Sequence, residues 1–206
     1  PSPSRKRQES QLCRRQLIAP VRNSRHTLAT TNRGLATMPL SLHAAFVPSC
    51  RQIIGGCLGV LAKAEAAGIG DLAEQKLAAA MFPLAFQVQS VAAHSAGAIA
   101  AVRKGEFGPG GGLPMPAADY ASFAAMLGQA DAALAAVTEA EMAGFIGGKT
   151  DFVFRDRRMP FKSEDFLLSF SQPNFYFHAS MVYAIFRNKG LAIGKMDFMG
   201  RPRMAM

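Results

Sequence analysis

Residues 42–64, LHAAFVPSCRQIIGGCLGVLAKA, carry apolar side chains at the spacing of an α-helix. Arg51 and Lys63 fall on other faces of the helix, and Gly68 and Gly70 follow as terminators. The sequence therefore predicts an amphipathic helix that starts at Leu42 and packs one face into a core. The buried stripe should comprise Leu42, Phe46, Cys50, Ile53, Cys57, Val60, Leu61 and Ala64.

A second helix is predicted over Phe82–Lys104. Pro83 lies in its first turn, where the missing amide proton costs nothing, and Arg103 and Lys104 suit its carboxyl end. The preceding segment Asp71–Met81 is predicted to be helical as well. Together the two segments would form a kinked pair.

The next part of the chain predicts a loop, a helix and a hairpin in that order. Gly105–Pro116 is too rich in glycine and proline for a helix, and Ala117–Met142 carries a helical apolar stripe. Thr150–Phe161 alternates apolar and polar residues around a polar turn, which is typical of a short β-hairpin. The solvated face of the helix should hold Asp119, Asp131, Glu139 and Glu141.

The last helix is predicted over Ser163–Asn188 and should end before Gly190. Ser163 is a good N-cap residue, and acidic residues follow it in the first turn. Pro173 should produce a kink or a brief break, because its ring removes an amide donor from the helix. The remaining residues, 191–206, are expected to form a tail.

The positive charge is concentrated near the start of the chain. The formal charge of the 206 residues is +9, but residues 1–37, with eight Arg or Lys and one Glu, contribute +7 and leave +2 for residues 38–206. Residues 1–37 lack apolar periodicity, so we expect them to be disordered and separate from the folded domain, residues 38–206. They could be a basic arm that binds nucleic acid or an anionic surface, a transit peptide, or a stretch upstream of a natural start at Met38. The near-neutral folded domain is not expected to bind nucleic acid.

Two uncharged stretches, residues 77–102 and 166–186, have the length of membrane spans. Amide and imidazole side chains near their centres would be costly in lipid, so both are better interpreted as central helices of a bundle. The three cysteines are too few for a disulfide framework, and no apolar signal region follows the basic residues. We therefore expect a cytoplasmic protein without a membrane partner.

Polar residues on the buried stripes are the main chemical clue. Gln87 and His94 lie on the second predicted helix, and Asn174 and His178 interrupt the stripe of the last one. An antiparallel arrangement would bring all four into one interior, as a satisfied structural network or as the floor of a pocket. The residues by themselves favour the network. His43 should be exposed at the start of the first helix.

The usual catalytic and metal motifs are absent from the sequence. No Ser lies in a GxSxG motif, and neither Cys50 nor Cys57 has an assignable base, so both are interpreted as small buried hydrophobic residues. No HExxH or CxxC motif and no close carboxylate pair is present. We therefore predict no metal ligands and no cofactor.

Three segments occur in order: SLHAAFVPSC (41–50), MFPLAFQVQS (81–90) and SFSQPNFYFHASMVYAIFRNKGLAIGKMDFMG (169–200). Together they resemble the uncharacterised, mainly bacterial domain-of-unknown-function family nineteen-ninety-three, which is grouped with the DinB/YfiT-like helical bundles. The resemblance spans Met38 to Arg203. It implies an all-α four-helix bundle of the up-down-down-up type, to which the periodicity adds a short β-hairpin before the last helix.

The resemblance also implies where a metal would bind in the wider superfamily. Better-studied relatives hold a divalent metal with one His on the second helix and two His, four residues apart, on the last. By this motif His178 matches the first of that pair, Val182 occupies the second place, and Gln87 lies near the place on the second helix. Valine cannot bind a metal and a neutral amide is a poor zinc ligand, so the resemblance implies the fold and not the metal.

Three functional hypotheses follow. The first is a helical bundle that binds a small molecule in a polar interior pocket around Gln87, His94, Asn174 and His178, without a firmly held metal. The second is a metal-dependent transferase or isomerase that uses a thiol cofactor, like enzymes of the DinB superfamily. The third is a non-catalytic interaction module that forms a homodimer.

Overall fold

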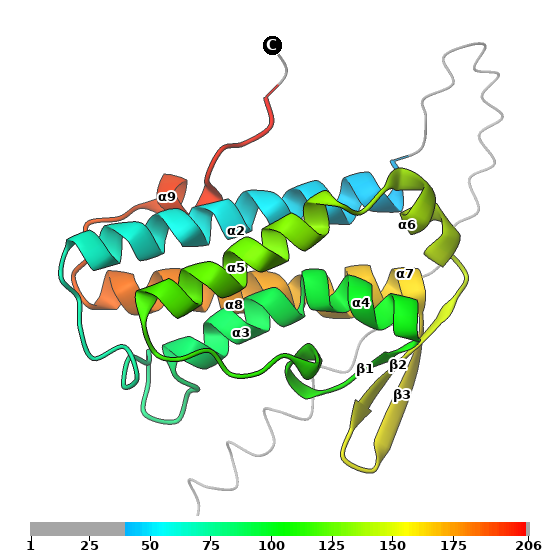
Figure 1. Ribbon diagram of the computed structural model, residues 1–206, viewed down its shortest axis with the longest axis horizontal. Coiled ribbons are helices and arrows are strands. Elements are labelled where there is room, and N and C mark those ends of the chain that lie inside the picture. The colour runs from blue at the N-terminus through cyan, green and yellow to red at the C-terminus, as the bar shows by residue number, and fades with distance from the viewer. Residues whose placement is uncertain (1–39, 205–206) are drawn as a thin grey trace, which may run out of the picture. The chain divides into compact units, whose positions relative to one another are not determined.

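The computed structural model describes residues 40–204, so the predicted basic segment 1–37 lies outside the described residues. The described part is mostly helical with a small three-stranded sheet. Its longer helices lie side by side (Figure 1), because α2 and α3 each pack against both α5 and α8. Their bounds are α2 Leu42–Ala66, α3 Leu84–Ala93, α5 Tyr120–Ala135 and α8 Gln172–Asn188.

Helix α2 confirms the apolar stripe from which its position was predicted. The Ser41 hydroxyl accepts a hydrogen bond from the Ala44 amide at 3.0 Å and caps the helix. All eight stripe residues are buried. The helix ends at Ala66, and Gly68 adopts a φ of 68°, a left-handed conformation that glycine takes at little cost.

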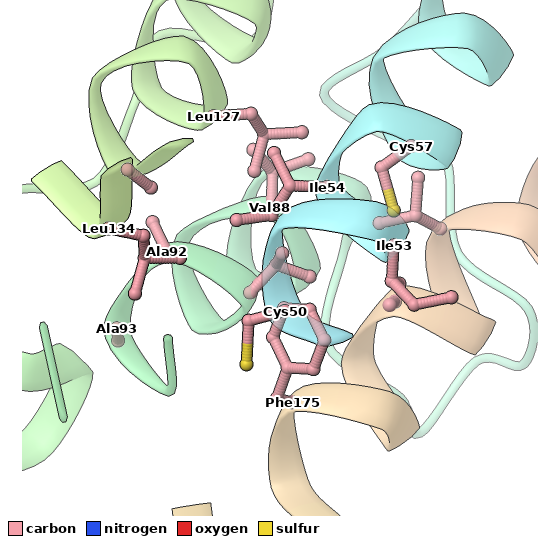
Figure 2. Packing of buried hydrophobic residues seen from close by; sticks show 14 of the residues in the cluster. Cys50, Ile53, Ile54, Cys57, Val88, Ala92, Ala93, Leu127, Leu134 and Phe175 are labelled. Atoms are coloured by element: carbon pink, nitrogen blue, oxygen red, sulfur yellow. The ribbon is translucent and has the colours of Figure 1, made fainter. Parts of the chain in front are cut away.

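The core lies where α2, α3, α5 and α8 meet. Figure 2 shows Ile54, Val88 and Leu127 reaching toward one another from three of these helices, with Cys50 beside Phe175 of α8. All five side chains are fully buried. Burial raises the pKa of the Cys50 thiol and keeps it uncharged, which agrees with its predicted role as a small hydrophobic residue.

The predicted second helix is broken into α3 and α4 (Ala96–Lys104), so the prediction of one continuous helix is wrong. The chain leaves helical geometry at Ser95, with φ −113° and ψ −95°. The Ser95 hydroxyl donates to the Val91 carbonyl at 2.6 Å, a local bond by which serine competes with the backbone. The break places His94 at the carboxyl end of α3.

Segment 71–81 forms turns, not the predicted helix. Gln75 makes two hydrogen bonds in place of a helical pattern. Its side-chain amide donates to the Gly70 carbonyl at 3.0 Å, and its backbone carbonyl accepts from the Leu84 backbone amide at 2.8 Å. The bond from Leu84 ties the segment to the start of α3, and the bond to Gly70 ties it to the residues that follow α2.

The predicted third helix is also divided, because α5 and α6 (Glu139–Phe145) meet at an angle of 88°. Thr138 is the N-cap of α6, and its hydroxyl accepts a hydrogen bond from the Glu141 backbone amide at 3.2 Å. The four acidic residues predicted to be solvated are all exposed or half-buried, as expected, and three of them form ion pairs at the surface. The pairs are Asp131 with Arg51, Glu141 with Arg103 and Glu139 with His43.

The predicted hairpin is confirmed as β2 (Lys149–Phe154) and β3 (Arg157–Lys162), with Phe152 opposite Met159. A third strand, β1 (Glu106–Phe107), pairs parallel to β2 and comes from the segment predicted to be only a loop. A short 3₁₀ turn, η1 (Pro109–Gly112), follows it.

The last helical region is a succession of α7 (Ser163–Asp165), the π-helical segment η2 (Phe166–Ser171) and α8. Ser163 is not the N-cap; Lys162 is, and the Ser163 hydroxyl instead contacts the Thr150 hydroxyl at 3.0 Å. Pro173 lies in the first turn of α8, directly after the π-helical segment. The chain stays helical at Pro173, and the irregularity next to it is the change from π-helical to α-helical hydrogen bonding. The helix ends at Asn188, as predicted.

The carboxyl-terminal tail contains a helix that the sequence did not predict, α9 (Lys195–Met199), and it packs on α2. The contact needs Gly56, because a Cβ atom at that position would collide with the backbone carbonyl of Phe198. Lys63 and Asp197 form an ion pair across the same interface.

Among the described residues, one helix, α2, is long and apolar enough to cross a membrane, and α5 with α6 would qualify only as one bent unit. Half of the most apolar window of α2 is buried inside the fold. The uncharged stretch 77–102 is divided between turns and two short helices.

Candidate functional site

Gln87 of α3 and His178 of α8 meet across the interface between their helices. Their contact is a hydrogen bond of 2.7 Å between His178 Nδ1 and Gln87 Oε1. The other end of the amide is also engaged, because Gln87 Nε2 donates to the Phe82 carbonyl at 3.0 Å. Gln87 is 2% exposed, so this buried amide uses both of its polar atoms.

These two hydrogen bonds define the protonation of His178. The Phe82 carbonyl can only accept, so the amide nitrogen of Gln87 faces Phe82 and the amide oxygen faces the imidazole. His178 must then carry its proton on Nδ1, which leaves a lone pair on Nε2 in the neutral ring. Nε2 makes no hydrogen bond to any residue within 40–204.

His94 lies beside His178 at the end of α3. The two rings are nearly parallel, with an interplanar angle of 10° and ring centroids 5.9 Å apart. His94 Nδ1 is buried and has no hydrogen-bond partner in the described part of the chain. Buried polar atoms normally have a partner, so this nitrogen is an unusual feature of the interface.

Both imidazoles are neutral at physiological pH. Burial lowers the pKa of His178 from 6.5 to about 4. Burial also lowers the pKa of His94 to about 4, and repulsion from His178 contributes in the same direction. At neutral pH, the His94 and His178 imidazoles can therefore donate and accept hydrogen bonds but carry no charge.

Phenylalanine rings surround the pair on several sides. Phe86 and Phe177 lie 5.8 Å and 5.2 Å from the His178 ring, centroid to centroid. Phe107 of β1 and Phe170 of η2 contact His94 at 5.1 Å and 5.8 Å. Phe177 is 52% exposed, and both histidines are partly exposed, so one side of the cluster reaches solvent. These rings were not predicted as site residues, although Phe170 and Phe177 are seven positions apart, which places them on one face of a helix together with His178.

The structure thus brings together three of the four predicted site residues, namely Gln87, His94 and His178. Asn174 does not join them through its amide, because Asn174 Nδ2 donates to the Phe170 carbonyl one turn earlier in the same helical region, at 2.8 Å. We define the His178 cluster as Gln87, His94, His178 and their four phenylalanine neighbours, Phe86, Phe107, Phe170 and Phe177.

His43 was predicted to be exposed, but its side chain is half-buried. Its Nε2 lies 3.1 Å from the Val137 carbonyl and its Nδ1 3.2 Å from a carboxylate oxygen of Glu139. The side chain ties the start of α2 to the turn between α5 and α6. The sequence prediction failed here because the right-angle bend before α6 was not foreseen.

The superfamily metal site does not fit the side chains around His178. Val182, in the second histidine position, is fully buried and has no donor atom. Both polar atoms of Gln87 are already engaged by His178 and Phe82. Residues 40–204 contain no group of three or more His, Cys, Asp or Glu side chains placed to hold a metal ion.

The fold defines the class of protein. The crystal structure of a DinB family member protein from Shewanella denitrificans superposes with a TM-score of 0.63 at 20% sequence identity. The match covers 80% of this chain and 95% of the other. The chain therefore has a DinB-like helical fold, and a likeness at this identity concerns the fold alone.

The family follows from the sequence itself. The model of the family described as Domain of unknown function (DUF1993) matches residues 42–199, and the chain belongs to this family. The resemblance noted in the sequence is thereby confirmed. No curated protein matches the chain.

Proposed function

We propose that the helices form a DinB-like four-helix bundle that binds a small molecule at the His178 cluster, without a firmly held metal. The observation that carries the proposal is the Gln87–His178 hydrogen bond, because it fixes the imidazole and leaves Nε2 as an acceptor. The buried His94 Nδ1 lacks a partner among the described residues, and a ligand or water entering the cluster could provide one.

The surroundings favour an uncharged ligand with an aromatic or apolar body and one hydrogen-bond donor. Phenylalanine rings flank the His178 imidazole, and such rings stack on flat apolar groups. No carboxylate or cation of the described chain makes a hydrogen bond or an ion pair with either imidazole. A charged ligand would lose its hydration there without gaining an opposite charge.

The imidazole chemistry favours binding over proton abstraction. A pKa of about 4 makes His178 a weak base at neutral pH, poorly matched to general-base catalysis, which is most efficient when the catalytic pKa lies near the working pH. The same neutral ring remains a good hydrogen-bond acceptor. His178 would therefore orient a hydroxyl or N–H group of the ligand and leave its proton in place.

A homodimeric interaction module is the second candidate. Phe82 and Phe177 are 62% and 52% exposed, and aromatic rings of this size are enriched in protein interfaces. Sedimentation at increasing concentration would test it, with the Phe177→Ser variant as the dimer-breaking control. The predicted cytoplasmic location and the absence of a membrane partner remain predictions.

Phenol and toluene are suitable probes, because they share a ring and differ in one hydroxyl. We expect phenol to shift the NMR signals of the His178 imidazole with a Kd of about 1 mM, and toluene to bind roughly tenfold more weakly. His178→Phe should reduce phenol affinity to that of toluene. His43→Gln should leave it unchanged, because the half-buried His43 contacts Val137 and Glu139 and not the cluster. Equal affinity for both probes, or shifts confined to residues outside the cluster, would contradict the proposal.

A further inference from the structure

A cavity of about 320 Å³ lies between α4, α5 and the segment that precedes α5. Its lining does not include any residue of the His178 cluster. Apart from Arg103 and Gln129, the lining side chains are apolar, and they include Ala100, Leu113, Met126 and Ala133. Binding sites for small molecules commonly have this size and this mixture of apolar walls with few polar groups.

One wall of this cavity is fixed by a hydrogen bond. The buried amide of Gln89 donates to the Leu113 carbonyl at 2.7 Å and fixes the loop that forms one wall. Gly110 packs against the same amide so closely that a Cβ atom there would lie 3.2 Å from Gln89 Nε2. Ala100 and Ala133 carry only a methyl group, so they leave the space beside this wall unfilled.

Arg103 supplies a positive charge at this cavity. Its Nε donates to Glu141 Oε1 at 2.6 Å, which orients the guanidinium and raises its pKa further. The terminal N–H groups of Arg103 make no hydrogen bond to residues 40–204, and no acidic side chain from that part of the chain lines the cavity. A guanidinium oriented in this way is suited to a carboxylate, which it can bind through two parallel hydrogen bonds.

We propose that this cavity binds a small amphiphilic carboxylate, with its acid group on Arg103 and its apolar chain against Ala100, Leu113 and Met126. The terminal N–H groups of Arg103, which Glu141 leaves free of hydrogen bonds within residues 40–204, provide donors for the acid group, and the methyl and thioether groups provide an apolar surface for the chain. The site is independent of the His178 cluster, where the proposed ligand is uncharged. One protein could thus hold two ligands of different chemistry.

Hexanoate and its uncharged isostere hexanamide test the role of the charge by calorimetric titration of the full chain. Hexanoate should bind with a Kd of about 1 mM or below, and hexanamide at least about tenfold more weakly. Arg103→Met, which keeps the length and apolar stem of the side chain, should remove this preference. An equal affinity of the wild-type protein for the two probes, or an unchanged preference in Arg103→Met, would overturn the proposal.

Two variants on α5 test the location. Ala133→Leu should fill the cavity and weaken hexanoate binding at least about tenfold, because the new isobutyl group occupies the space of the chain. Ala132→Leu is the matched control, since Ala132 is also exposed on α5 but does not line the cavity. Both alanines are exposed, so both variants should fold, which the amide NMR spectrum would verify. Hexanoate binding that survives Ala133→Leu, or that Ala132→Leu abolishes equally, would refute this site.

Discussion

Replacing Gln87 by leucine should release His178 from the tautomer in which α3 holds it. In the native chain Oε1 of the Gln87 side chain accepts the Nδ1 proton of His178 at 2.7 Å, and Nε2 of the same side chain donates to the Phe82 backbone carbonyl at 3.0 Å. Leucine matches the shape of glutamine closely enough to fill the buried space but offers neither group. The substitution therefore isolates the two hydrogen bonds from packing.

The expected cost follows from what the variant leaves without a partner. The Nδ1–H of the partly buried His178 would lose its acceptor, at about 1–3 kcal/mol for an unsatisfied donor, while the Phe82 carbonyl belongs to an exposed residue and can bind water. We expect the free energy of unfolding to fall by about 2 kcal/mol. For a domain of this size that corresponds to a decrease in Tm of about 4–8 °C.

Urea unfolding would measure the stability, and the ¹⁵N signals of the imidazole would report the tautomer. Wild-type His178 should carry its proton on Nδ1, and Gln87→Leu should populate the Nε2–H form. Gln89→Leu is the matched control: Gln89 is a buried amide on the same helix, bonded to the Leu113 carbonyl, so its loss should reduce stability but leave His178 unchanged. An unaltered His178 tautomer in Gln87→Leu would refute the reasoning.

Three further predictions concern the rest of the fold. His94 and His178 have pKa values of about 4 in the folded chain and near 6.5 in the unfolded chain, so the unfolded chain binds more protons between these pH values. The free energy of unfolding should therefore fall below pH 6.5 by about 1 kcal/mol per pH unit for each of these partly exposed histidines. Urea unfolding at several pH values would measure this slope, and His178→Gln should halve it. Gly56→Ala should displace α9 and lower the free energy of unfolding by about 1–3 kcal/mol, as thermal unfolding would measure. Gly55→Ala is the control: a Cβ atom there meets nothing within 4 Å, so this variant should raise the free energy of unfolding by up to about 1 kcal/mol. Equal effects of the two variants would argue against the α9 contact. Removing residues 1–37 should leave the Tm unchanged, since they lack apolar periodicity; a loss of several degrees would show that they pack on the domain.

The sequence by itself was sufficient for features that depend on neighbours along the chain. The stripe from Leu42 to Ala64 predicted which face of α2 is buried, because helical periodicity is a local property. The alternation around Phe152 likewise predicted the hairpin, and Gly190 the end of α8. The PNFYFH motif and its neighbours identified the family, which the match over residues 42–199 confirms.

Helix breaks were beyond the sequence prediction because the signals for them are ambiguous. Ser95 lies on an apolar stripe that would continue through it, and only the folded chain shows its hydroxyl bonded to Val91. Thr138 and Glu141 have the spacing of a capping pair, yet Ala136 and Val137 before them are also compatible with a continuing helix. Tertiary packing decides such cases, since helical propensities differ by less than about 1 kcal/mol per residue.

The chemistry of the candidate site was decided by the tertiary structure. Gln87 and His178 are 91 positions apart, and their types suggested only that both would be buried near each other. How α3 meets α8 decides which nitrogen of His178 carries the proton and leaves the buried Nδ1 of His94 without a partner in the described part of the chain. The Asn174 amide bonds within its own helical region. Local sequence determines which residues form a helix and which face is apolar. Hydrogen bonds between distant side chains form only when the packed core brings those faces together, and the pKa of a histidine depends on the water that this packing removes.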